Sequence, residues 1–140
     1  MTTQGIGPIK QAVVKALRDN ATLKAAVSNE IHESLTPREV GYPYCVYEVL
    51  WSARGYDWTS SQIECGVRIW IISDDQVEAH NLDALVIEAM QDKALDLSTS
   101  GMFALYCRRV GDASMVDIDD AGKKIYQVGG VFEILADHTL

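Results

Sequence analysis

The feature that most constrains the fold of this chain is a strict alternation of side chains between Gln62 and Ile72. One face of this stretch carries apolar residues, namely Ile63, Cys65, Val67, Ile69 and Ile71. The other face carries Gln62, Glu64, Gly66, Arg68 and Trp70. Successive side chains of a strand point to opposite faces of a sheet, so this pattern predicts a half-buried antiparallel strand.

The hydrophobic period changes directly after this strand. Apolar residues then recur at steps of three and four, as on one face of a helix, at Ala79, Leu82, Leu85, Val86, Ala89 and Met90. The residues Ser73–Gln76 have the S-x-x-Q spacing of a capping box, which predicts the start of that helix. We therefore predict that a strand leading into an amphipathic helix, over Gln62–Met90, forms the centre of the fold.

The length of 140 residues predicts a single domain over residues 1–140, large enough to bury a core without cross-links. A hydrophobic content of 48% is typical of a soluble globular protein. No apolar run approaches the roughly 18 residues that a membrane helix needs, so we expect no membrane partner. The segment Met1–Gly7 lacks an apolar stretch, and we expect no signal peptide.

The three cysteines, Cys45, Cys65 and Cys107, are widely spaced and each lies in an apolar strand pattern. An odd number without short spacing argues against a disulfide framework. We expect free, buried cysteines of a protein that folds in a reducing compartment.

The net charge of −8 comes from 12 basic and 20 acidic residues. The only adjacent basic pairs are Arg108-Arg109 and Lys123-Lys124. Tight DNA binding uses clustered basic side chains that displace counterions from phosphate, so specific nucleic-acid binding is disfavoured.

The first part of the chain predicts helices and then a long irregular segment. A helix starting at Pro8 would bury Ile9, Val13, Ala16 and Leu17 and end at Asp19-Asn20. Residues 22–27 predict one or two further helical turns, and residues 28–43 are irregular with room for a short strand over 31–34. The next strand, Tyr44–Ala53, would place Cys45 and Trp51 on the same face.

The connection 54–61 is longer than a tight hairpin needs and carries Tyr56 and Trp58. These aromatics either fold over the sheet edge or form a protein contact. After the central helix we predict a turn over 96–101 and a strand over Phe103–Val110. An acidic loop over 111–123 and a last strand over 125–135 follow, in which Gly129-Gly130 indicates a bulge or a close backbone approach.

This order predicts an α+β fold, with a mainly antiparallel four- to five-stranded sheet and two helices packed on one face. The opposite face would carry Arg68, Trp70, Tyr106 and Arg108. Arginine and aromatic residues are enriched at subunit interfaces, and plain solvent exposure is the alternative for this face.

No catalytic, metal or cofactor motif stands out, and we expect a protein that is not an enzyme and holds no cofactor. The cysteines and the histidines His32, His80 and His138 lack the short spacing of zinc ligands. The segment 117–122 lacks the spacing of a calcium loop, and Gly5-Ile6-Gly7 follows no strand as a nucleotide motif would require.

Taken in order, the chain resembles the tail-terminator or tail-completion proteins of long-tailed bacteriophages and prophages over Ile9–Leu135. The resemblance lies in the opening helix with its leucine-containing turn and in the strand start Pro43–Tyr47. It continues in the strand that ends at Trp70-Ile71 before the helix, and in the acidic loop before a Tyr-x-Val strand, Asp119–Val128.

The resemblance implies a structural virion protein that acts in the host cytoplasm and then in the tail or neck. Such proteins form a ring, usually hexameric, that ends the tail tube and docks the head-tail connector. DNA passes through the lumen without specific binding, and a ring needs a head-to-tail interface. We expect sheet-edge pairing and the 54–61 loop to supply part of the subunit or tail interface, with candidate residues Arg54, Tyr56, Trp58, Arg68, Trp70 and Arg108.

Two other hypotheses remain open from the sequence. One is a small cytosolic α+β enzyme or ligand-binding module with a pocket between sheet and helices. The other is a host regulator that binds a protein through its sheet edge.

Overall fold

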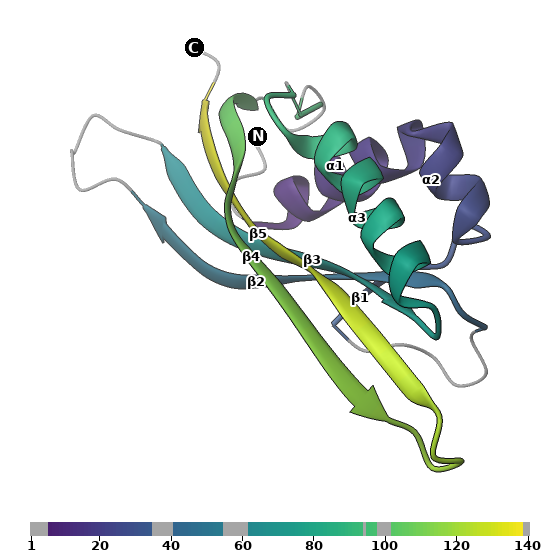
Figure 1. Cartoon of the computed structure of the whole chain (residues 1–140). Helices are drawn as coiled ribbons and strands as arrows, with labels where there is room; N and C mark the ends of the chain where they lie inside the picture. Colours follow the sequence, from purple (N-terminus) through teal and green to yellow (C-terminus); the bar gives the residue numbers. More distant parts are fainter. Residues whose placement is uncertain (1–5, 35–40, 55–61, 94, 98–101, 139–140) are drawn as a thin grey trace.

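A computed structural model describes residues 6–34, 41–54, 62–93, 95–97 and 102–138 (Figure 1). The helices are α1 (Ile6–Asp19), α2 (Ala21–Ala26) and α3 (Gln76–Met90). The strands are β1 (Ile31–Glu33), β2 (Tyr44–Arg54), β3 (Ile63–Ser73), β4 (Met102–Ile118) and β5 (Lys124–His138). None of the helices in these ranges has the length and apolarity that crossing a bilayer requires.

The strands form one five-stranded sheet in the order β1-β2-β3-β5-β4. Only β1 and β2 run parallel, and the other neighbouring strands are antiparallel. Figure 1 shows the helices on one side of the sheet and the β4–β5 hairpin extending past them. The predicted α+β class with a mainly antiparallel sheet is confirmed.

The strand and helix predicted at the centre are present as β3 and α3, but the helix cap differs from the prediction. Ser73 is still in β3, and the extended residue Asp75 caps the helix. Its carboxylate accepts hydrogen bonds from the amides of Val77 and Glu78 at 3.0 and 3.3 Å. Ser73 supports this turn, since its hydroxyl donates to the Glu78 carboxylate at 2.9 Å and accepts from the Asp75 amide at 3.0 Å.

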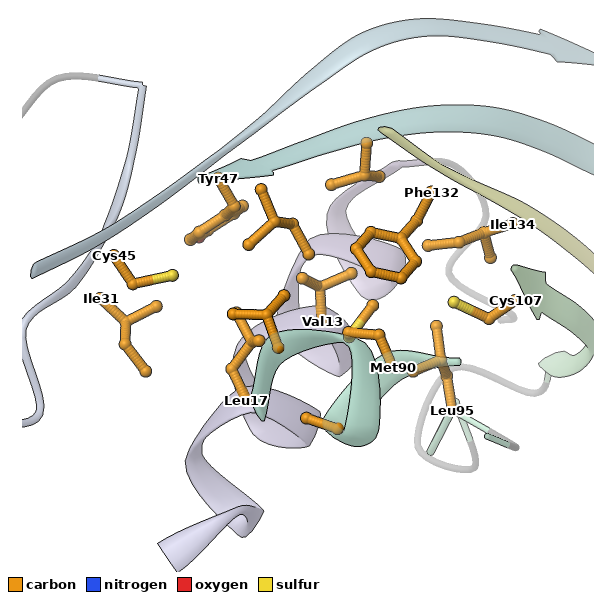
Figure 2. Packing of buried hydrophobic residues seen from close by; sticks show 14 of the residues in the cluster. Val13, Leu17, Ile31, Cys45, Tyr47, Met90, Leu95, Cys107, Phe132 and Ile134 are labelled. Carbon is orange, nitrogen blue, oxygen red and sulfur yellow. The ribbon is translucent and has the colours of Figure 1, made fainter. Parts of the chain in front are cut away.

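One hydrophobic core lies between the helices and the sheet (Figure 2). Phe132 of β5 points from the sheet toward Val13 of α1 and Met90 of α3, and all three are fully buried. The predicted apolar faces of β3 and α3 belong to this core, with Leu85 packed at its margin. The sheet and helices are therefore joined mainly by apolar burial, the largest favourable contribution to folding.

The three cysteines are free and buried, as predicted. Burial raises the pKa of Cys45, Cys65 and Cys107 to about 12 in each case. A thiol with such a pKa stays protonated near neutral pH, and the thiolate is the reactive form. These cysteines therefore behave as small core residues.

The N-terminal predictions hold with small shifts. Helix α1 begins at Ile6, two residues before the predicted start, and buries Ile9, Val13 and Leu17. The predicted helical turns after residue 22 form α2, where the side chain of Asn20 accepts a hydrogen bond from the amide of Leu23 at 3.0 Å. The short strand predicted before residue 35 is β1, on the edge of the sheet.

The predicted acidic loop over 111–123 is wrong for most of its length. Strand β4 continues to Ile118, and its residues pair with β5 as far as Ile118 opposite Lys124. Only the turn after Ile118 remains, where the Asp119 carboxylate accepts hydrogen bonds from the amides of Ala121 and Lys123 at 2.9 and 2.8 Å. Residues 110–118 are exposed on both faces, so their sequence carries no burial pattern that would mark a strand.

Candidate assembly surfaces

The helix-free side of the sheet carries the arginine and aromatic residues that the sequence placed there. We call this the outer face and define it by Trp51, Arg68, Trp70, Tyr106, Arg108 and Glu133. The guanidinium of Arg68 lies 4.1 Å from the ring centroid of Trp70, two residues along β3. Trp70 also packs on a small apolar cluster on this side, formed by Val46, Ile72 and Ile125.

A polar network crosses the other half of the outer face. Glu133 of β5 lies opposite Arg108 and accepts hydrogen bonds from the hydroxyl of Tyr106 at 2.7 Å and from Arg108 at 3.2 Å. The bond to the Glu133 carboxylate is the largest cause that raises the pKa of Tyr106, to about 12. The same bond, followed by the hydrogen bond from Arg108 and then its charge, lowers the pKa of Glu133 against the opposing effect of burial. This network joins three polar side chains from β4 and β5 on the outer face.

The position of Trp51 corrects the sequence prediction. The β2–β3 register shifts between Val49 and Trp51, so Trp51 lies opposite Gly66 and not on the side of Cys45. A β-bulge inserts one residue, and because side chains alternate, every later residue changes face. A Cβ on Gly66 would lie 2.3 Å from the indole nitrogen, so the Trp51 ring covers this glycine. The bulge thus adds a tryptophan, 43% exposed, to the outer face.

A second bulge corrects the predicted alternation over residues 103–108. The β4–β5 register shifts between Ala104 and Tyr106, which separates Phe103 and Leu105 from Cys107. Phe103 and Leu105 are more than 40% exposed, whereas Cys107 is fully buried. Ala104 packs against the core in their place.

The far end of the β4–β5 pair forms a second surface, which adjoins the outer face where Ala113 and Met115 lie near Arg68 and Trp70. We call residues 110–124 the distal hairpin. Its residues Val110, Met115, Val116 and Ile118 expose at least half of their surface. Four aspartates lie among them, Asp112, Asp117, Asp119 and Asp120. At the tip, Lys123 donates a hydrogen bond to Asp74 at 2.6 Å, which ties the turn to the β3–α3 connection.

Arg109 anchors the base of the distal hairpin to α3, and the sequence analysis did not identify this role. Its guanidinium donates two hydrogen bonds to Asp83 of α3, at 3.1 and 3.0 Å, and is 9% exposed. It also lies 5.2 Å from the ring centroid of Phe132. The Arg109 amide donates to the Gln91 side chain at 2.6 Å, so the end of α3 covers the β4 edge here.

Gly129-Gly130 provides the close approach that the sequence indicated. A Cβ on Gly130 would lie 2.1 Å from Nε of Arg109, and one on Gly129 would lie 2.1 Å from the carbonyl oxygen of Ile69. Gly130 therefore leaves the space that the Arg109 side chain occupies on the sheet. Gly130 lies opposite Asp112 in the register, and the Arg109 side chain reaches it diagonally across the strand pair, so the pairing register was needed to find this contact.

The predicted interface residues fall into two groups. Arg68, Trp70 and Arg108 lie together on the outer face. Arg54 is the last residue of β2, and Tyr56 and Trp58 lie outside the described residues. Within the described ranges, no group of three or more metal-ligating side chains is close enough to hold an ion.

Comparison with known proteins identifies the family. A family model described as "Tail completion protein gp17" matches residues 11–126. No curated protein matches the chain. A chain of a solved structure described as the virion of a native gene transfer agent particle has a TM-score of 0.74 and 20% identity, covering 89% of this chain and 91% of that chain.

A second solved chain has a TM-score of 0.58 and 13% identity, covering 99% of this chain and 98% of that one. At these identities the two structures show the fold alone. The family match extends over most of the 140 residues, from within α1 to within β5. This protein therefore belongs to the tail completion protein gp17 family, a family of structural phage tail proteins.

Proposed function

We propose that this protein forms a ring, of six subunits, on the end of a phage tail tube. The ring stops polymerisation of the tube and gives the head-tail connector its docking surface. The observation that carries the proposal is the family match over residues 11–126. The likeness in fold to a chain from a gene transfer agent virion supports a place in the tail or neck of the particle.

The surfaces of the subunit are consistent with this role. A ring subunit needs a head-to-tail interface with its neighbours and a further contact with the tube or connector. The outer face and the distal hairpin adjoin, and the helices leave both uncovered (Figure 1). The outer face, with Arg68, Trp70 and Arg108, has the residue types of a protein interface.

DNA has no specific site in this proposal and only passes through the lumen. The subunit charge of −8 multiplies in a ring, and an acidic wall repels the phosphate backbone. Arg54, Tyr56 and Trp58 stay predictions for the same interface.

No observation among the described residues favours the enzyme or ligand-binding alternative. Phe132 and Met90 fill the middle of the space between the sheet and the helices (Figure 2). The cysteine pKa values near 12 leave little thiolate to act as a nucleophile.

A tube-capping experiment tests the proposal. Tail tube protein from the same phage is polymerised with and without this protein, and tube lengths are measured by electron microscopy. We expect short tubes with a ring of density at one end, and a complex of six chains by native mass spectrometry. Tubes that grow to the same length distribution in the presence of the protein would exclude the terminator role.

Substitutions on the outer face sharpen the test. The double variant Arg68→Ser/Trp70→Ser removes the stacked pair, and we expect it to weaken capping while the chain still folds. Val77→Ser is the matched control, because Val77 is 68% exposed on α3 and lies off the sheet. Equal capping by both variants would show that this part of the outer face contacts neither tube nor connector.

A further inference from the structure

The distal hairpin is an apolar edge that the fold itself leaves uncovered. Strand β4 is at one edge of the sheet, and Val116 and Ile118 are 56% and 65% exposed. Met115 and Val116 lie on opposite faces of the strand, so neither face of this segment is buried. An exposed apolar edge of this kind is a site for association with another chain.

The charge of the distal hairpin restricts what can cover it. The distal hairpin carries four aspartates, Asp112, Asp117, Asp119 and Asp120, against two lysines, Lys123 and Lys124. Lys123 is paired with Asp74 outside the hairpin, so the hairpin stays acidic. Two copies related by a twofold axis at this hairpin would place acidic side chains against each other. Like charges brought together in an interface cost several kcal/mol. The aspartates therefore favour a partner surface that carries basic side chains.

The same chain carries such a basic surface on its other side. Helices α1 and α2 hold four basic residues, Lys10, Lys15, Arg18 and Lys24, and a single acidic one, Asp19. This is unusual in a chain with 20 acidic and 12 basic residues. Three of these basic residues line an open groove of about 630 Å³ between α1 and strands β1 and β2. We call it the α1 groove; its charged lining is Lys10, Lys15, Arg18, Asp19 and Glu33, and Val14 and Tyr47 also line it.

The basic side chains of the α1 groove have only exposed partners within the chain. Lys10 pairs with Glu33 and Lys15 with Asp19, and all four side chains are about one-third exposed or more. Exposed ion pairs contribute about 0–1 kcal/mol, so aspartates of another chain can replace them at little cost. Val14 and the edge of Tyr47 give the groove an apolar part.

The two surfaces lie at opposite edges of the sheet. The distal hairpin includes β4, and the α1 groove borders β1 and β2, in the strand order β1-β2-β3-β5-β4. A surface that binds a different surface on the next copy makes a heterologous contact, and such contacts build a ring where the rotation between copies closes. We propose that the distal hairpin of one subunit docks in the α1 groove of the next, with its aspartates facing Lys15 and Arg18.

This inference rests on the proposed ring and names the surfaces that join its subunits. Two charge-reversed variants test it. The hairpin variant is Asp117→Lys/Asp120→Lys, and the groove variant is Lys15→Glu/Arg18→Glu. Oligomer mass is measured by native mass spectrometry, with and without tail tubes, and circular dichroism checks that each variant is folded.

Each variant alone should need about a hundredfold higher concentration to assemble than the unmodified protein. An equimolar mixture should recover assembly, because reversed hairpins then meet reversed grooves and native hairpins meet native grooves. Glu88→Lys is the matched control, since it reverses one exposed acidic charge on α3, outside both surfaces. It should assemble like the unmodified protein.

The outcomes separate this inference from the proposed function. If either variant alone forms the complete ring on tube ends, the hairpin–groove contact is overturned and the terminator role stands. If the unmodified protein forms rings that depend on both surfaces but caps no tube, the contact stands and the terminator role fails. If it forms no oligomer even on tubes, both fail. A mixture that does not recover assembly also overturns the contact.

Discussion

The two ends of the β4–β5 pair have the same backbone pairing but opposite surroundings. Near the base, Cys107 and Phe132 are fully buried under the helices. Nine residues beyond Cys107 along β4, Val116 is 56% exposed. Base and distal hairpin are thus one ladder in which tertiary packing covers only one end. Strand pairing, the Lys123–Asp74 contact and the Arg109–Asp83 pair hold the distal hairpin in place, whereas its apolar surface stays available to another chain.

The largest expected loss of stability comes from a substitution at the base of the β4–β5 pair. Phe132→Ala removes a fully buried ring from the centre of the core (Figure 2) and should lower the free energy of unfolding by about 3–5 kcal/mol. Val116→Ala in the distal hairpin should change it by less than about 0.5 kcal/mol. Urea unfolding followed by circular dichroism measures both. Equal losses would show that the distal hairpin is packed in solution.

The Arg109–Asp83 pair joins the two regions, and breaking it should come next in size. Asp83→Ala leaves the nearly buried Arg109 guanidinium without its bidentate partner, and Asp112 is 82% exposed. We expect a loss of about 3 kcal/mol, since the pair is largely buried. Amide hydrogen exchange should rise most in residues 110–118. Arg108→Ala is the control, because its pair with Glu133 leaves Arg108 56% exposed.

If exchange in 110–118 stays unchanged in Asp83→Ala, the anchor does not hold the distal hairpin. If Arg108→Ala loses as much stability as Asp83→Ala, exposed and buried arginine pairs contribute alike, and the buried Arg109–Asp83 pair has no special role.

A smaller loss of stability is expected from adding one methyl group at Gly130, beside the Arg109 side chain. In Gly130→Ala the new carbon would lie 2.1 Å from Arg109 Nε and from the Gly111 carbonyl oxygen. The crowding should cost about 1–3 kcal/mol. Gly111→Ala is the matched control in the distal hairpin, because its Cβ would meet nothing within 4 Å. A thermal melt of the two variants that gives the same midpoint would contradict the close packing at Gly130.

The smallest effect concerns the exposed network of the outer face. Glu133→Gln removes the carboxylate that raises the pKa of Tyr106 to about 12, so this pKa should fall toward its ordinary value near 10. Ultraviolet titration of tyrosinate follows the change. The pKa of Glu133 is lowered in the folded state, so its stabilising contribution is present above its unfolded pKa and lost as pH falls through the folded one. An unchanged tyrosine titration would contradict the bond.

Sequence patterns predicted well the part of the fold in which the helices cover the sheet. The β3–α3 unit was predicted nearly to its ends, because burial on one side leaves a period of two in a strand and of three to four in a helix. The outer-face positions of Arg68 and Trp70 followed from the same period. The helix cap was predicted at Ser73 but is Asp75. Both residue types are good caps, and only the end of β3 distinguishes the two positions.

The part of β4 that the helices do not cover could not be predicted in the same way. Residues 111–118 form a strand without a buried face, so no hydrophobic period marks it. The change of face at Trp51 comes from a bulge, which depends on how β3 pairs with β2. Arg109 looked like half of a basic dipeptide, and its partners Asp83 and Gly130 are distant in sequence. Contacts of this kind are set by strand register.

Sequence patterns were sufficient for the fold class, the central strand and helix, the buried cysteines and the resemblance to tail completion proteins. These depend on local periodicity and composition, which each segment carries alone. The three-dimensional structure was needed to show that β4 extends into an exposed hairpin, that Trp51 joins the outer face, and that the distal hairpin and the α1 groove lie at opposite sheet edges. The physical reason is that register, bulges and edges belong to pairs of distant strands, and no single segment encodes them.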